Sequence, residues 1–581
     1  MNSSPPRSIQ CSDFINRELS LLAFNRRVFS QALDADTPAL ERLRFLCIVS
    51  SNLDEFFEVR VAGLKEQLRA GAAVLSYDGR TAAETFDLVA SESHALVKEQ
   101  YELLNRDVLP RLEHEGIRFL RRAHWSEAVC KWAKEYFESE VAPVVTPIGL
   151  DPSHPFPRVL NKSLNFAVEL EGRDAFGRAS KAAIVQAPRV LPRVIRLPKA
   201  VSQYDYDFVF LSSIMHAFVG ELFTGMEVKG CYQFRVTRNS DLFVDEEEVK
   251  NLRTRLQGEL PQRHFGDAVR IEVADNCSPE MTKFLLSQTG LGEVDLYRVN
   301  GPVNLARLMQ IPDLVERPDL KFKPFIPGTP KQFEKPGQDI FDAIRKGDVL
   351  LHHPYQSFTP VINLLQTAAT DPDVVAIKMT VYRTGTDSVL METLVRAAQA
   401  GKEVTVVVEL MARFDEEANI GWSTRLEEVG AHVVYGVVGY KTHAKALMII
   451  RRELEGKNKR VLRRYVHLGT GNYHPRTARL YSDFGLMTCN PEIGADVAEI
   501  FQQLTGLGRA QSLHHLWQAP FTLHTNVIAA IEREVRNAKA GKPAHIIAKM
   551  NSLLEPQTIS ALYAASQAGV KIDLLIRGAC A

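Results

Sequence analysis

Apolar residues recur at every third or fourth position over the first part of the chain. This spacing places them on one face of a helix and leaves the remaining faces polar. Between residues 14 and 114 the repeating apolar positions are Leu19, Leu22, Phe24, Val28, Leu43, Leu46, Phe56, Val59 and Leu64. The pattern predicts an N-terminal helical domain over residues 1–114.

A polar cluster, Ser50-Ser51-Asn52-Leu53-Asp54-Glu55-Phe56, interrupts this pattern. Serine and asparagine are preferred N-cap residues, because their side chains accept hydrogen bonds from the first backbone amides of a helix. The pattern alone therefore favours a helix start near Asn52.

Short runs of alternating apolar and polar residues follow, mixed with helical patterns. Strands are predicted at 164–170, 181–187 and 231–237, and helices near 245–256 and 279–288. This mixture is typical of an α+β domain, which we place at residues 115–330. A proline-rich stretch over 323–336 predicts a linker to the next domain.

Residues 331–510 have the pattern of an α/β domain. A strand is predicted at 374–382, an amphipathic helix at 388–401, and a near-continuous apolar strand, typical of a parallel sheet, at 403–410. Arg383 and Arg413 follow these two strands. Functional residues of open α/β sheets gather at the carboxyl ends of strands, so the two arginines are expected to converge on one site. The alternative is that both are solvated loop residues.

The pattern of this α/β domain is repeated in residues 511–581. Ile377-Lys378-Met379 and the segment 397–404 are echoed by Ala548-Lys549-Met550 and the segment 564–571. Two copies of one unit predict a pseudo-twofold arrangement with a site between them. The second copy is expected to be incomplete, since a counterpart of His443 would fall near position 611, beyond Ala581.

The segment 439–485 carries the densest candidate chemistry. His443 and Lys445 flank Ala444, and an apolar run over 446–450 predicts a buried strand. A basic turn is expected over 451–464, followed by a short strand over 465–468. The polar residues that follow are His467, Gly469, Thr470, Gly471, Asn472, Arg476, Arg479, Tyr481 and Asp483.

This composition suits phosphate chemistry. Residues i and i+2 of a strand face the same side, so His443 and Lys445 are expected to point together. A neutral imidazole can act as a nucleophile, and a neighbouring ammonium can hold the phosphoryl oxygens that it attacks. Gly469 and Gly471 would let backbone amides approach an anion. Each piece alone has a simpler reading, a surface His-x-Lys pair and an ordinary turn, but their combination favours a phosphate site.

Composition places limits on the partners. The 581 residues include 70 basic and 70 acidic side chains, so there is no global electrostatic case for nucleic acid or an anionic membrane. The seven cysteines form no Cys-x-x-Cys pair, which argues against a zinc site and for reduced thiols. No apolar stretch reaches membrane-spanning length. We expect a cytoplasmic protein, with peripheral membrane attachment left open.

Three segments closely resemble the signature sequences of bacterial, phosphohistidine-forming polyphosphate kinases, and through them the phospholipase D superfamily. The segments are His443-Ala444-Lys445, His467-Leu468-Gly469-Thr470-Gly471-Asn472 and Thr477-Ala478-Arg479-Leu480-Tyr481-Ser482-Asp483-Phe484. The aspartate that phospholipase D carries shortly after the lysine is missing from 446–452, which favours the kinase. The implied fold is multidomain α/β: a helical domain, an α+β domain and two phospholipase-D-like domains, the second truncated at its C-terminus.

The resemblance also implies roles for individual residues. His443 would carry the phosphoryl group with Lys445 beside it, and Asn52, Tyr481 and Arg577 would bind ATP. Arg383 and Arg413 would bind phosphate oxygens that also contact Mg²⁺, since a guanidinium has no lone pair to offer a metal. His467, Gly469, Gly471 and Asn472 would form a further phosphate loop.

The expected activity is reversible transfer of the terminal phosphate of ATP to inorganic polyphosphate, with Mg²⁺ as cofactor, in a homo-oligomer. Two alternatives remain at this point. One is a phospholipase-D-like phosphodiesterase that uses the same His-Lys pair. The other is an inactive polyphosphate-binding protein, because the second histidine of the family is missing.

Overall fold

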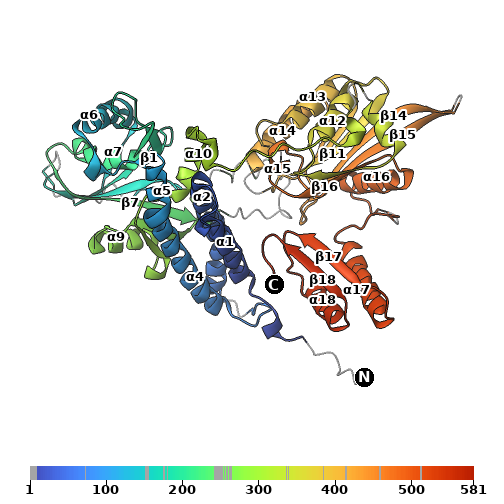
Figure 1. Ribbon diagram of the computed structural model, residues 1–581, viewed down its shortest axis with the longest axis horizontal. Coiled ribbons are helices and arrows are strands. Elements are labelled where there is room, and N and C mark those ends of the chain that lie inside the picture. The colour runs from blue at the N-terminus through green and yellow to red at the C-terminus, as the bar shows by residue number, and fades with distance from the viewer. Residues whose placement is uncertain are drawn as a thin grey trace. The chain divides into compact units, whose positions relative to one another are not determined.

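The computed structural model describes residues 9–71, 74–150, 156–173, 177–178, 181–240, 253, 256, 260, 265–334, 337, 339–383, 385–412, 415–456, 459–510 and 513–581. The chain divides into two compact units (Figure 1). Unit 1 comprises Met1–Asp241, Gln262–Lys323 and Val527–Ala581, and unit 2 comprises Leu242–Pro261 and Pro324–Asn526. The C-terminal segment therefore groups with the N-terminal part of the chain.

Unit 1 begins with the predicted helices, and their apolar faces share one core. They are α1 (Arg17–Leu33), α2 (Ala39–Phe56), α3 (Ala62–Arg69), α4 (Ala82–Leu103) and α5 (Leu109–His114). The expected helix start near Asn52 is wrong, because α2 continues through the polar cluster. Ser50 and Asp54 are buried inside the unit, and the Asp54 carboxylate accepts hydrogen bonds from Arg235 and Arg270, so this polar cluster belongs to the interior.

A six-stranded sheet packs in the same unit, in the order β2-β4-β3-β7-β8-β9. Its strands are β2 (Pro147–Gly149), β3 (Asn165–Glu171), β4 (Ala182–Gln186), β7 (Glu227–Arg238), β8 (Ala268–Ala274) and β9 (Leu296–Val299). Helix α9 (Pro279–Thr289) covers part of it, and β1 (Ile117–Phe119), β6 (Tyr206–Phe210) and β5 (Val194–Arg196) form a smaller sheet. The predicted mixture of strands and helices is confirmed for the described part of this region, and the helix expected near 245–256 lies almost entirely outside the described residues.

The C-terminal part of unit 1 contains α17 (Leu523–Lys539), β17 (His545–Met550), α18 (Pro556–Gln567) and β18 (Lys571–Ile576). β17 and β18 are parallel and joined by α18. β11 (Val374–Val381) and β12 (Glu403–Val408) of unit 2 pair in the same way across α13 (Val389–Gln399), which matches the repeat found in the sequence. The amide of Ile15 donates to the carbonyl of Ala581 at 2.6 Å, and the Tyr563 hydroxyl donates to the carbonyl of Asp13 at 2.8 Å.

Unit 2 is built on a seven-stranded sheet in the order β10-β16-β15-β14-β11-β12-β13. The strands are β10 (Val349–His353), β11 (Val374–Val381), β12 (Glu403–Val408), β13 (His432–Val434), β14 (Lys445–Glu455), β15 (Lys459–Gly469) and β16 (Asp483–Thr488). β11, β12 and β13 are parallel, as the apolar runs predicted, while the other pairings are antiparallel.

Helices cover both faces of this sheet. One face packs against α11 (Ile340–Lys346), α12 (Thr359–Thr370), α13 (Val389–Gln399) and α14 (Glu416–Glu428), and the other packs against α16 (Pro491–Gly506). The layered arrangement is visible in Figure 1. The multidomain α/β class with a helical N-terminal part is therefore confirmed.

The turn expected over 451–464 is wrong. β14 continues to Glu455 and β15 begins at Lys459, so the segment forms a long antiparallel hairpin. Charged residues such as Arg451 and Glu453 occupy every second position and so lie on one face of the strand. A strand can therefore form here although neither face is continuously apolar.

In the described part of the chain, no helix combines the length and the apolar character needed to cross a membrane.

Candidate active site

His443 lies in the loop that leads into β14, and Lys445 is the first residue of that strand. The expectation that both stand on one strand is therefore only half correct. Thr380 of β11 holds the loop, because its hydroxyl donates to the carbonyl of Ala444 at 2.7 Å and accepts from the amide of Ala446 at 3.0 Å. The strand entry is thus tied to the centre of the sheet.

The two side chains differ in exposure but are close together. His443 is exposed, and its ring packs edge to face on Tyr382 with centroids 5.1 Å apart. Lys445 is only 7% exposed, lies 5.3 Å from the Tyr382 ring, and donates to the carbonyl of His443 at 2.5 Å. Tyr382 was not selected from the sequence, yet it packs against both.

The local field keeps His443 neutral. Neighbouring protein atoms displace part of the water around the exposed ring, and this desolvation lowers the pKa of His443; the charges of Lys445 and Arg383 lower it further. Burial lowers the pKa of Lys445 to about 8; Asp483 opposes this shift and Arg383 adds to it. At pH 7 the site therefore presents an uncharged imidazole beside two cations, an arrangement suited to nucleophilic attack on an anion.

Arg383 follows β11, as predicted, and its Nε lies 3.3 Å from Oδ2 of Asp415. Burial raises the pKa of Asp415, while Arg383 acts in the opposite direction. This arginine therefore belongs to the cluster around His443. Arg413 lies outside the described residues.

Gly469 and Gly471 pack against the site rather than forming an open loop. A Cβ at Gly471 would lie 2.4 Å from Oδ2 of Asp483, and one at Gly469 would lie 3.7 Å from Cβ of Lys445. Thr470 donates its hydroxyl proton to Asp483 at 2.8 Å. The glycines therefore bring Asp483 close to Lys445. No acidic residue follows Lys445 within 446–452, but the carboxylate of Asp483, which is distant in sequence, lies near the lysine in the fold.

Asn472 shows one further feature of this loop. Its Oδ1 is buried and has no hydrogen-bond partner within the described residues.

His467 is 2% exposed and lies beneath this loop. The Tyr473 hydroxyl donates to the carbonyl of His467 at 3.2 Å, so it accepts from Nδ1 of the His467 ring at 2.9 Å. Burial lowers the pKa of His467 to about 3, with His353 contributing. His467 is therefore a neutral supporting residue in this structure and does not present its ring to solvent.

His353, which the sequence analysis missed, faces His467. Its Nδ1 donates to the carbonyl of Gln356 at 2.8 Å. A Cβ at Gly485 would lie 2.6 Å from Nε2 of His467 and 3.6 Å from Nε2 of His353, so the two rings converge over this glycine. Neither nitrogen has a hydrogen-bond partner among the residues that the structure describes.

Tyr481 comes shortly after the short helix α15 (Pro475–Ala478) in the same unit. Its amide donates to the carbonyl of Thr477 at 3.1 Å, and its side chain is partly open to solvent, since the residue is 39% exposed. The position is compatible with the predicted role in nucleotide binding.

Two predicted nucleotide ligands belong to unit 1. Asn52 lies on α2 and donates from Nδ2 to Oδ1 of Asn25 at 3.0 Å. Arg577 directly follows β18 and donates from Nε to Oδ1 of Asn551 at 2.8 Å. Each is held by a neighbouring asparagine, which fixes its direction within that unit.

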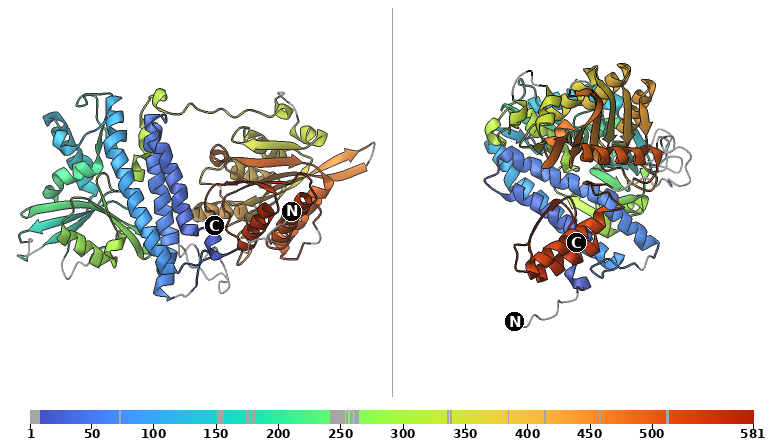
Figure 2. Two further views of the ribbon diagram at one scale, coloured as in Figure 1. Left: turned by 60° about the horizontal axis from the view of Figure 1, so that its bottom comes forward. Right: turned by 90° about the vertical axis from the view of Figure 1, so that its right-hand side faces the viewer.

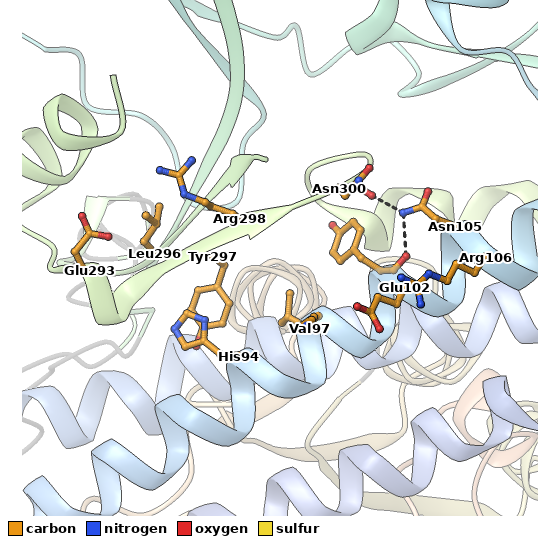
Figure 3. Close-up of a pocket in the computed structure, with 12 residues that line it drawn as sticks. His94, Val97, Glu102, Asn105, Arg106, Glu293, Leu296, Tyr297, Arg298 and Asn300 are labelled. Atoms are coloured by element: carbon orange, nitrogen blue, oxygen red, sulfur yellow. Dashed lines mark hydrogen bonds between the residues drawn. The ribbon is translucent and has the colours of Figure 1, made fainter. Parts of the chain in front are cut away.

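A cavity in unit 1 is lined by none of the predicted site residues. It has a volume of about 620 Å³ and lies between α4 and β9 (Figure 3). His94 stacks on Tyr297 with centroids 3.9 Å apart, and Asn105 donates to the carbonyl of Asn300 at 2.6 Å.

The side chains near His443 were compared with the requirements of a metal site. Within the described residues no group of three or more histidine, cysteine, aspartate or glutamate side chains is placed to hold a metal ion. Asp415 and Asp483 lie near the site, and both face cations of the protein. Glu409 also lies nearby and accepts from the amide of Thr442 at 2.6 Å.

Comparisons with known proteins agree over most of the length of the chain. Four family models match successive segments of the chain: the polyphosphate kinase N-terminal domain at residues 14–120, the middle domain at 129–311, C-terminal domain 1 at 339–510 and C-terminal domain 2 at 516–581. The polyphosphate kinase of Burkholderia multivorans is 62% identical over 98% of this chain and 82% of its own length. That of Paraburkholderia phytofirmans is 60% identical over 97% of this chain and 82% of its own.

A solved structure gives the same result. The crystal structure of polyphosphate kinase from Porphyromonas gingivalis superposes with a TM-score of 0.82 and 31% sequence identity, covering 98% of this chain and 81% of that one. Sequence and fold therefore point the same way: this chain belongs to the polyphosphate kinase family.

Proposed function

We propose that the protein transfers the γ-phosphoryl group of ATP reversibly to inorganic polyphosphate through a phosphohistidine at His443. The observation that supports this most strongly is the exposed, neutral imidazole of His443 beside Lys445 and Arg383. A nucleophile surrounded by cations suits a reaction in which an anionic group is received and passed on.

The transfer occurs in two balanced steps. A ring nitrogen of His443 attacks the γ-phosphorus of ATP, the bond to the β,γ-bridging oxygen breaks, and ADP leaves. A terminal oxygen of polyphosphate then attacks the same phosphorus, the phosphorus–nitrogen bond breaks, and the chain is longer by one unit. Because both steps exchange similar bonds, the reaction runs in either direction.

The protein contributes position and charge. Lys445 and Arg383 neutralise the oxygens of the transferred group, and Tyr382 holds the imidazole edge to face. Asp415 orients Arg383. Because the transition state of phosphoryl transfer is loose, electrostatic stabilisation of this kind is expected to supply most of the rate enhancement.

Mg²⁺ and the nucleotide complete the proposal. Mg²⁺ would neutralise charge on the phosphate oxygens, and Arg383, with Arg413 outside the described residues, would hold those oxygens. Asn52, Tyr481 and Arg577 are assigned to ATP binding, and Asn472 contributes a buried, unpartnered oxygen to the neighbouring loop.

The test is phosphoryl labelling with ATP that carries a radioactive γ-phosphate. The intact protein should acquire an acid-labile, base-stable label, and His443→Ala should lose it. His432→Ala is the matched control, because that side chain is 71% exposed in the same unit and lies on β13 away from the cluster. Undiminished label in His443→Ala would refute the assignment.

A further inference from the structure

The β14–β15 hairpin extends past the other strands of the unit 2 sheet, as the orange ribbon in Figures 1 and 2 shows. Its register pairs Arg452 with Leu462, and Leu454 with Arg460. Because side chains alternate between the two faces of a strand, the register divides the hairpin into two faces of different character.

On one face the charged side chains are paired with one another. Glu453 lies at its centre and is 5% exposed at the side chain, where it accepts from Nε of Arg463 at 2.7 Å and from Nη1 of Arg451 at 3.2 Å. Arg451 also pairs with Asp371 at 2.9 Å. Nearer the tip, Lys459 pairs with Glu455 at 2.9 Å. Each cation that the structure describes on this face, Arg451, Arg463 and Lys459, has an acidic partner.

On the opposite face the cations have no acidic partners within the described residues. It presents Arg452, Arg460 and Arg464, all exposed, together with the exposed Leu454 and Leu462. Within the described residues, none of these three guanidinium groups makes an ion pair or side-chain hydrogen bond, and none of the hairpin residues on this face is acidic. We call this set of three arginines the hairpin arginine face.

The arginines are evenly distributed along the ribbon. Ile450 is paired with Arg464, so each of three successive rows on this face carries one arginine and one apolar residue. Rows on one face are about 7 Å apart, since a strand rises about 3.4 Å per residue. Further in, the same face is covered by α16, where the Arg464 side chain approaches Gly494. The open part is therefore the projecting end.

Such a face is complementary to a regularly charged anion. Guanidinium groups bind phosphate oxygens with paired hydrogen bonds and keep their charge at every accessible pH. The protein as a whole carries no net charge, with 70 basic and 70 acidic residues, so this concentration of unpaired cations is local. The two leucines are separated by arginines and do not form the continuous apolar surface that a membrane-inserting segment presents.

We propose that the hairpin arginine face is a second contact site for long polyphosphate chains, apart from the site at His443. The proposal rests on the proposed function, since it assigns the same substrate to a further surface. Lys445 and Leu454 are nine residues apart on β14, so the tip lies about 30 Å from the reacting end. Only a chain long enough to span this distance can occupy both sites.

Binding measurements with two probes test the proposal. The double variant Arg452→Gln/Arg460→Gln should weaken binding of long-chain polyphosphate by about tenfold or more and leave tripolyphosphate binding unchanged. The slope of log K against log salt should become shallower by about 0.7 for each arginine removed, as for a single-stranded polyanion. Both side chains are exposed, so thermal unfolding should match that of the parent protein.

The matched pair is Arg460→Gln against Lys459→Gln. These neighbours carry the same charge change but point to opposite faces, and only Arg460→Gln should weaken long-chain binding. Equal weakening by both, an unchanged affinity in the double variant, or loss of binding to phosphatidylglycerol vesicles in place of polyphosphate would each overturn the proposal. Labelling of His443 should persist in all variants, so a failure of the phosphohistidine mechanism is recognised separately.

Discussion

At the scale of single residues, the site depends on two neighbours in opposite environments. His443 is exposed and can meet a substrate, whereas Lys445 is 7% exposed and keeps its charge at the expense of solvation. Burying an ammonium destabilises the folded protein unless the charge is compensated. Asp483 supplies part of that compensation, which explains why two glycines bring its carboxylate so close.

The pKa shifts predict a bell-shaped dependence of the transfer rate on pH. On the acid side the rate should fall, because protonation of His443 removes the nucleophile. Since the pKa of His443 is lowered from the ordinary value of 6.5, this fall should occur below pH 6.5. On the alkaline side it should fall through about pH 8, where Lys445 loses its charge. Lys445→Arg should move the alkaline limb to higher pH while leaving the acid limb in place, as measured by kcat against pH.

Replacing Lys445 is expected to raise the stability of the protein and to abolish its activity. The pKa of Lys445 in the folded protein is about 8, below the ordinary 10.5, so the unfolded chain binds the proton more tightly. Lys445 therefore destabilises the folded protein most below pH 8. Lys445→Met should raise the free energy of unfolding at pH 7, by up to roughly 3 kcal/mol, and abolish transfer. The gain should shrink as pH rises from 8 towards 10.5 in urea unfolding. A gain that is independent of pH would contradict this account.

Gly485 predicts a steric requirement. A Cβ there would lie 2.6 Å from Nε2 of the buried His467, so Gly485→Ala forces that ring to move and should destabilise unit 2 by about 1–3 kcal/mol. The control is Gly506→Ala, where no atom lies within 4 Å of the new methyl group. Comparison of the two by urea unfolding isolates the clash, and equal stability of both variants would show that His467 can yield.

At the scale of elements, α2 is fixed to the sheet of unit 1 by a buried ion cluster. Asp54 accepts from Nη1 of Arg235 at 2.9 Å and from Nη2 of Arg270 at 2.6 Å, and Glu272 pairs with both arginines. The four side chains are almost completely buried. The cluster therefore determines the position of the helix that carries Asn52.

Removal of the central carboxylate should be severe. Asp54→Ala leaves an excess positive charge in the interior and should lower the free energy of unfolding by about 3–5 kcal/mol. Asp313→Ala is the control, because that side chain is 81% exposed in its pair with Arg44 and should change stability by less than about 1 kcal/mol. The pKa of Asp54 is lowered by its arginines, so the difference should diminish only as pH falls below 3.8.

At the scale of the whole molecule, the two ends of the chain share one small core. Phe14 packs against the apolar cluster formed by the C-terminal helices and strands, while Ile15 is 56% exposed. The N-terminal residues thus stabilise β17 and β18, which have only each other as sheet partners among the described strands. A two-stranded sheet is marginal without such packing.

This packing predicts coupled exposure of the termini. Phe14→Ala should increase hydrogen exchange of the β17 and β18 amides, because truncation removes an apolar contact from their core. Ile15→Ala should leave exchange near the parental rate, since its side chain is largely exposed. Protection that is unaffected by Phe14→Ala would mean that the C-terminal elements are stable on their own.

The sequence by itself determined many of the local elements and singled out candidate residues for the chemistry. The predicted strands at 374–382 and 403–410 match β11 and β12 closely, because buried parallel strands require apolar runs that are visible without any partner. Where local signals competed, it failed. The polar residues around Asn52 suggested a helix start, and the basic residues after Ile450 suggested a turn, because burial and pairing with distant elements were not visible.

Only the tertiary structure decided which distant groups surround His443 and in what state. Tyr382, Asp415 and Asp483 come from separate elements, and their distances to the His-Lys pair determine which nitrogen is charged at pH 7. Desolvation and Coulomb interaction depend on packing in three dimensions, so no local pattern can encode a pKa of about 8 for Lys445. The same holds for the hairpin arginine face, since strand register alone separates paired from unpaired cations.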